Sequence, residues 1–171
     1  IDLDEEGKVT LENVKKAVTE HTKIISLAQI TNVLGYLAPI KEICNFAHEH
    51  DIIVCVDGAQ SAPHHAVDVQ DLDVDFFAFS GHKMCGPTGV GVLYGKYHLL
   101  DEMTPTRFGG GSNARYNSCG LVKLKNAPTK FETGTPNIEG VIGLGSAIEY
   151  LQNIGMKNIE EHEAMLRKYA V

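Results

Sequence analysis

Lys83 has the most unusual surroundings of any side chain in the sequence. It lies where the apolar segment Val74–Phe79 gives way to a glycine-rich turn, close behind Ser80 and His82. An amine that reacts covalently needs a partly dry site with hydrogen-bond donors nearby, whereas lysine is otherwise a strongly hydrated surface residue. Ser80 and His82 are candidate donors. Lys83 is therefore a candidate covalent anchor, although its local pattern alone favours a solvated lysine.

A second polar cluster, Asp57–Gln60, follows the apolar run Ile52–Val56. Ligands of open α/β sheets bind beyond the carboxyl ends of the strands, so both clusters are expected to face one crevice. A lysine that forms an imine, an aspartate that keeps a ring nitrogen protonated and small phosphate donors are the groups that pyridoxal phosphate requires. Asp57 fits the ring nitrogen, and Ala59 would let the ring lie flat. On local grounds Asp57 equally fits a residue that only caps its turn.

Strands and helices alternate in the part of the chain that must position these groups. Thr10 is a predicted N-cap of a helix over Leu11–Thr19, and Pro39 opens a second helix. Ile24–Ile30 and Ile52–Val56 are predicted strands. The order strand, helix, strand predicts a right-handed parallel crossover.

The second half of the chain completes the predicted fold. Val74–Phe79 is a predicted strand, and Gly89–Tyr94 follows after a turn too short for a crossover helix, so it is expected to be antiparallel. Helices are predicted over Asn137–Asn153 and Ile159–Tyr169, and Arg107–Thr135 is expected to be a loop. The predicted fold class is α/β, with three layers: a mostly parallel mixed sheet and helices on both faces.

Composition limits the kinds of function. The 171 residues are 43% hydrophobic, which suffices for one compact domain, and the formal net charge of -7 argues against general nucleic-acid binding. A small-molecule ligand is favoured. No apolar run is long enough to cross a bilayer and no signal peptide is recognisable, so a cytoplasmic protein without membrane association is expected. The 4 cysteines lack metal-ligand spacing, and we expect reduced thiols, with Cys44 and Cys55 buried.

The ends of the chain and the number of strands indicate a fragment. The sequence begins at Ile1 without a methionine and ends at Val171 inside a predicted helix. Four strands are also few for a doubly wound sheet. We therefore expect residues 1–171 to be a single, incomplete piece of a larger protein.

Five motifs, in this order, resemble those of class V aminotransferase-type enzymes. They are Asp57–Ser61, Phe79–Lys83, Gly86–Gly91, Gly109–Gly111 and Phe131–Asn137. More narrowly, the chain resembles cysteine desulfurases of the sulfur-mobilisation (SUF) type and their selenocysteine lyase relatives, over nearly its whole length. The resemblance implies the large domain of a fold-type I pyridoxal-phosphate enzyme, with an N-terminal segment and a C-terminal small domain outside this chain.

The resemblance also implies how the cofactor ring is held. Lys83 is the catalytic residue and binds pyridoxal 5'-phosphate as a Schiff base. Asp57 meets the pyridine nitrogen, and Gln60 bonds the ring hydroxyl oxygen. Asn32 lies near the ring and the substrate.

Phosphate binding and a dimer follow from the same resemblance. Ser80 and His82 bind the phosphate within one subunit. Thr135 reaches the phosphate of a neighbouring subunit's cofactor. A homodimer with sites at its interface is therefore expected.

The implied reaction converts L-cysteine to L-alanine and passes sulfur as a persulfide to an acceptor protein of the SUF system, for iron-sulfur cluster assembly. The family's sulfur-accepting cysteine and substrate-binding arginine lie beyond this chain. Neither Cys85 nor Cys119 is taken as the sulfur carrier, and the chain alone is expected to be inactive. Two alternatives stay open: a selenocysteine lyase or other class V carbon-sulfur lyase, and a truncated cofactor-binding or dimerisation domain without catalysis.

Overall fold

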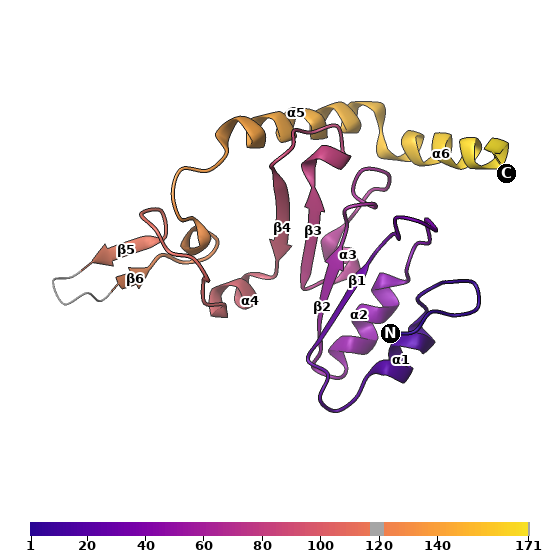
Figure 1. The fold of residues 1–171 in the computed structure, drawn as a ribbon, viewed down its shortest axis with the longest axis horizontal. Coiled ribbons are helices and arrows are strands. Elements are labelled where there is room, and N and C mark those ends of the chain that lie inside the picture. Colours follow the sequence, from indigo (N-terminus) through magenta and orange to yellow (C-terminus); the bar gives the residue numbers. More distant parts are fainter. Residues whose placement is uncertain (117–121, 171) are drawn as a thin grey trace.

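A four-stranded mixed sheet forms the centre of the molecule (Figure 1). The computed structural model describes residues 1–116 and 122–170. The strands, in their order across the sheet, are β1 (Ile24–Ala28), β2 (Ile53–Asp57), β3 (Phe76–Ser80) and β4 (Gly91–Gly95). β1, β2 and β3 run parallel, whereas β4 is antiparallel to β3. The predicted mixed, mostly parallel sheet is confirmed.

Two helices in the first half pack on this sheet, α1 (Leu11–Ala17) and α2 (Ile40–His48). Thr10 caps α1 as predicted: its Oγ1 accepts a hydrogen bond from Asn13 N at 3.2 Å. The apolar side of α2 faces the strands. The core between them contains Val14, Ile25, Ile40, Ile43, Cys44, Ala47, Val54, Val56, Val74 and Phe77.

The first strand is shorter than predicted. β1 ends at Ala28 rather than Ile30, because Ile30 forms only an isolated antiparallel bridge to Leu37 where the chain folds back. The residue between them, Gln29, still donates its N–H to Asp57 O at 2.9 Å. The loop after β1 is thereby held beside the end of β2.

The prediction that Arg107–Thr135 is a loop was wrong in part. The segment contains an antiparallel hairpin, β5 (Asn113–Tyr116) and β6 (Val122–Leu124), followed by a 3-10 helix, η2 (Thr129–Phe131). Figure 1 shows the hairpin as an arm beside the sheet. Strands of three or four residues offer too few alternations for periodicity to reveal them.

Two further short helices were not predicted. α3 (Val69–Leu72) is capped by Asp68, whose Oδ1 accepts two backbone hydrogen bonds of the first turn, at 2.9 and 3.0 Å. α4 (Tyr97–Glu102) anchors the hairpin arm: Lys130, which is 6% exposed, donates from Nζ to Asp101 O at 2.6 Å.

Helices α5 (Ile138–Ile154) and α6 (Met156–Ala170) follow one another across the end of the sheet at which β3 finishes (Figure 1). Both predicted helices are confirmed, and α6 begins three residues earlier than Ile159. α5 packs on the sheet through a second core. Its members are Met84, Leu144 and Leu151, with Phe79, Val90, Ile148, Met156 and Ile159 around them. Within the described residues, none of the helices combines the length and apolarity needed to cross a membrane.

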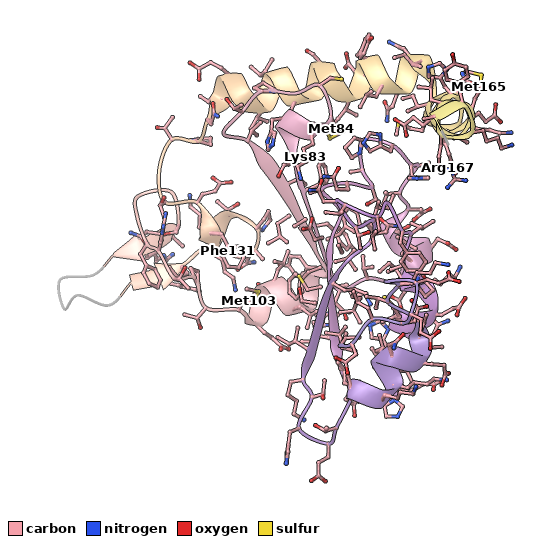
Figure 2. All side chains as sticks on the ribbon, turned by 45° about the vertical axis from the view of Figure 1, so that its right-hand side comes forward. Lys83, Met84, Met103, Phe131, Met165 and Arg167 are labelled. Carbon is pink, nitrogen blue, oxygen red and sulfur yellow. The ribbon has the colours of Figure 1, made fainter. Side chains whose placement is uncertain are left out.

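The two faces of the sheet are covered unequally. α1 and α2, in the pale violet part of the ribbon in Figure 2, lie on one side of it. Alternation along the strands places Ser26, Cys55 and Ala78 on the opposite face. Leu93, which pairs with Ala78, is 57% exposed there. This open face ends at the strand termini where the predicted site residues lie.

A charged cluster ties the other end of the sheet together. Asp75, 5% exposed, is hydrogen-bonded to Val54 N at 2.7 Å, His48 Nε2 at 2.9 Å and Lys96 Nζ at 2.9 Å. Burial acts to raise the pKa of Asp75, but these bonds outweigh it and the pKa lies below its ordinary value. Asp73 also has a lowered pKa, chiefly because of its hydrogen bond to Lys96.

Asp75→Asn should destabilise the intact protein by about 2 kcal/mol at neutral pH, because hydrogen bonds to a buried charge are lost. The carboxylate's contribution is fully present above its ordinary pKa of 3.8 and is lost as the pH falls through the lower folded value. The gap in urea midpoint between wild type and variant should therefore shrink at acidic pH. Asp71→Asn, exposed on α3, is the control. A gap that does not change with pH contradicts this role.

Candidate functional site

Four of the predicted site residues line one pocket at the carboxyl ends of β2 and β3. They are Asp57, Ala59, Ser80 and Lys83, and the pocket has a volume of about 450 Å³. Small-molecule sites typically span about 300 to 1,000 Å³. A carboxylate, a hydroxyl and an amine therefore meet in one depression, as the order of the strands predicts.

Asp57 is held at the last position of β2 by the turn that follows it. Its Oδ1 accepts a hydrogen bond from Ala59 N at 2.8 Å. Gly58 N donates to Ala78 O at 2.7 Å, and a Cβ on Gly58 would lie 2.0 Å from Phe77 Cζ, so no side chain fits there. Asp57 thus caps its own turn with one oxygen while it lines the pocket, and the two interpretations of this residue are compatible.

Lys83 ends the 3-10 turn η1 (Gly81–Lys83), which follows β3 directly. Gly86 N donates to Gly81 O at 2.9 Å and closes the turn. The next residue, Met84, is buried beneath α5, whereas Lys83 is exposed below it (Figure 2). Burial of Met84 in the second core therefore directs the lysine side chain toward the pocket.

Asn32 and Gln60 are joined by a hydrogen bond from Gln60 Nε2 to Asn32 Oδ1. Both line a second depression of about 430 Å³. Neither belongs to the residues that line the Lys83 pocket. The bond nevertheless brings together two predicted site residues from the loop after β1 and the turn after β2.

Helix α6 forms one wall of this second depression. Two histidines that were not predicted as site residues bind this helix to the turn after β2. His64 Nδ1 lies 2.6 Å from Glu163 Oε1, and His65 Nδ1 lies 3.2 Å from Glu160 Oε1. Arg167, labelled in Figure 2, lines the same wall. The glutamate partners of the two histidines lie about a hundred residues further along the chain, so no local sequence pattern could reveal these pairs.

His82 and Thr135 are placed differently from the other predicted residues. Both are exposed, and neither lines the Lys83 pocket. His82 is the neighbour of Lys83 within η1. Thr135 precedes α5, and Asn137 connects its segment to the Lys83 turn by donating from Nδ2 to Gly89 O at 3.3 Å.

Strand residues that were not predicted as part of the site form the floor of the pocket. They are Ser26, Cys55, Val56, Ala78 and Phe79. For Ser26, Cys55 and Ala78 the signal was the strand alternation that also directs Asp57 to the open face. Because these three side chains are small, they take up little of the space in the pocket.

The cysteines differ in their environments. Burial, with the nearby carboxylates of Asp75 and Asp73, raises the pKa of the Cys44 thiol to about 12, so this residue is an inert core thiol. Cys55 was predicted to be buried but is partly exposed in the pocket floor. Cys85 is exposed, and Cys119 lies outside the described residues. No metal-binding group of three His, Cys, Asp or Glu occurs in the described part of the chain.

A family model described as aminotransferase class-V matches residues 1–171. The chain belongs to the class-V aminotransferase family. The match includes every predicted site residue.

Individual class-V relatives narrow the comparison. A probable cysteine desulfurase from Halalkalibacterium halodurans is 52% identical over 171 residues, which are 99% of this chain and 41% of that protein. A solved apo structure of cysteine desulfurase from Thermococcus onnurineus superposes with a TM-score of 0.92 at 39% identity, over 99% of this chain and 42% of its own. A solved structure of a C-DES mutant, with glycine covalently linked to its PLP cofactor, superposes with a TM-score of 0.77 at 28% identity. The match covers 88% of this chain and 41% of that one. The chain thus spans about 41% of the length of the Halalkalibacterium halodurans relative.

Gly58→Ala should destabilise the intact protein by about 1 to 3 kcal/mol, the usual effect of overpacking, because the added methyl group collides with the Phe77 ring. Gly110→Ala is the matched control, since a Cβ there has nothing within 4 Å. Urea unfolding of both variants measures the difference. Equal midpoints would show that the turn can move away from Phe77 without cost.

Proposed function

We propose that the protein carrying this chain is a pyridoxal-phosphate-dependent cysteine desulfurase, which converts L-cysteine to L-alanine and passes the sulfur on as a persulfide. Residues 1–171 form part of its large, cofactor-binding domain. The observation that carries the proposal is the pocket that joins the Lys83 amine to the Asp57 carboxylate. The two relatives named as cysteine desulfurases support the choice of substrate.

The pocket fits the cofactor in its chemistry. Pyridoxal phosphate offers an aldehyde for an amine, a basic ring nitrogen for a carboxylate and a phosphate for hydroxyl donors, and the pocket presents Lys83, Asp57 and Ser80. Ala59 leaves room for a flat ring. When bound, the cofactor supplies an electron sink for the bonds of the substrate's α-carbon.

Residues of this chain hold the ring and move protons. Lys83 would hold the cofactor through Nζ. As a neutral amine beside the substrate's α-carbon, Lys83 Nζ would also take up and return the proton there. Asp57 keeps the ring nitrogen protonated, because a carboxylate stabilises the adjacent positive charge. Gln60, oriented by its hydrogen bond to Asn32, serves the ring oxygen, and Asn32 lies near the substrate.

Phosphate contacts extend the site to a second subunit. Ser80 and His82 bind the phosphate from the end of β3 and from η1. Thr135 serves the cofactor of the partner in a homodimer. Thr135 is exposed, which leaves it accessible to a partner subunit.

The sulfur-accepting thiol and the substrate-binding arginine are assigned to parts of the protein outside this chain. Cys44 is unsuited to the first role because its pKa is raised to about 12. The physiological role is supply of sulfur for iron-sulfur clusters through a SUF-type acceptor in the cytoplasm. The chain expressed alone should release no alanine from cysteine. Release of alanine by it places the complete reaction within residues 1–171.

Lys83→Ala in the intact protein should abolish alanine formation from cysteine, because no other residue of the pocket carries an amine. Lys157→Ala is the control, because the side chain of Lys157 is 87% exposed and pairs with Glu161 along α6, away from the pocket residues. Alanine released per minute is the measurement. An active Lys83→Ala protein excludes the proposed function.

Asp57→Asn should lower turnover by about 10- to 100-fold, because a charge-assisted hydrogen bond contributes about 1.5 to 3 kcal/mol. Asparagine retains a side-chain oxygen for the bond from Ala59 N, so the turn is preserved. Asp71→Asn again serves as the control. Turnover unchanged in Asp57→Asn would remove this residue from the ring-nitrogen role.

A further inference from the structure

Helix α5 makes an unusually close contact with the turn that carries Lys83. A Cβ on Gly143 would lie 2.7 Å from Cγ and 3.3 Å from Cδ of Pro87. A Cβ on Gly86 would lie 3.1 Å from Leu144 Cδ1. Because both positions are glycine, the helix and the turn can approach each other more closely than side chains at these positions would allow.

The proline side of this contact is coupled to Lys83 by a short, closed piece of chain. Gly86 N, next to Pro87, bonds Gly81 O, and Met84 N bonds the same oxygen at 3.0 Å. Pro87 O also lies 3.3 Å from where a Cβ of Gly81 would be. Because proline has a rigid ring and a fixed φ, a push on Pro87 moves the backbone of the turn rather than only a side chain.

Two further contacts hold the same turn against α5. Met84 is buried against Leu144 in the second core, and Asn137 bonds Gly89 O while its Oδ1 caps the helix at Gly140 N, at 3.0 Å. The turn is therefore supported at three points along the helix. Gly143 is the one at which an added methyl group meets a rigid ring.

We propose that Gly143 is a positioning residue, which sets the place of Lys83 by letting Pro87 seat directly on α5. This inference rests on the proposed function of Lys83 as the attachment point of pyridoxal phosphate. Glycine is otherwise unfavourable inside a helix, so alanine at 143 should improve the helix itself. A loss in Gly143→Ala must then come from the contact with the turn.

The chain supplies a matched control on the same helix. A Cβ on Gly145 has nothing within 4 Å, so Gly145→Ala changes the helix in the same way without touching the turn. In the intact protein, stripped of cofactor and mixed with pyridoxal phosphate, the absorption of the lysine-bound cofactor reports the rate of attachment. Gly143→Ala should attach at least about tenfold more slowly than wild type, as expected for a reacting group displaced by a fraction of an ångström to 1 Å. Gly145→Ala should match wild type.

A second substitution separates positioning from general damage. Pro87→Ala removes Cγ and Cδ, so Gly143→Ala combined with Pro87→Ala should attach the cofactor as fast as Pro87→Ala alone. The same non-additivity should appear in the urea midpoints of the cofactor-free proteins. If Gly143→Ala alone does not fold, the double variant should fold.

The outcomes that overturn the inference differ from those that overturn the function. Equal attachment rates in Gly143→Ala and Gly145→Ala, or a double variant that is no better than Gly143→Ala, refute the positioning role. If wild type binds no cofactor at Lys83, the proposed function fails. In that case the urea midpoints still test the contact. The contact is refuted if the effects of Gly143→Ala and Pro87→Ala on the midpoint add up in the double variant.

Discussion

The parallel pairing of β2 with β3 is the constraint on which the candidate site depends. This register places Asp57 opposite Ala78, two residues before the end of β3 at Ser80. Both strands therefore finish at one edge, where a carboxylate and the lysine turn meet. A slip of one residue would turn Asp57 to the helix-covered face, because strand side chains alternate. Gly58, seated on the Phe77 ring, and the core under α2 hold this register.

The two cores have different tasks. The core under α1 and α2 fixes the strands, whereas the smaller core of α5 fixes the turn that leaves β3. Met84 belongs to the second core and Lys83 precedes it, so the position of the lysine depends on a helix that begins more than 50 residues later. The glycine contact at Pro87 makes that dependence tight. Residues that never touch the pocket can therefore decide how its amine is presented.

Much of the fold follows from sequence patterns whose physical cause is local. The runs around Val54 and Phe77 and the capped helix after Thr10 are such patterns, and the polar clusters after both strands placed Asp57 and Lys83 in one pocket. The β5–β6 hairpin was missed because its strands are too short to show a period. The pairing of His64 with Glu163 and the contact of Gly143 with Pro87 depend on tertiary packing. No spacing in the sequence encodes them.

Mapping the attached cofactor tests the central claim most directly. The intact protein is mixed with pyridoxal phosphate, reduced with borohydride and digested, and its peptides are analysed by mass spectrometry. We expect the reduced cofactor on the peptide that contains Lys83, and the same peptide unlabelled in Lys83→Ala. Label on another lysine, such as Lys96 or Lys130, or no label on any peptide of wild type, would contradict the assignment of this pocket as the cofactor site.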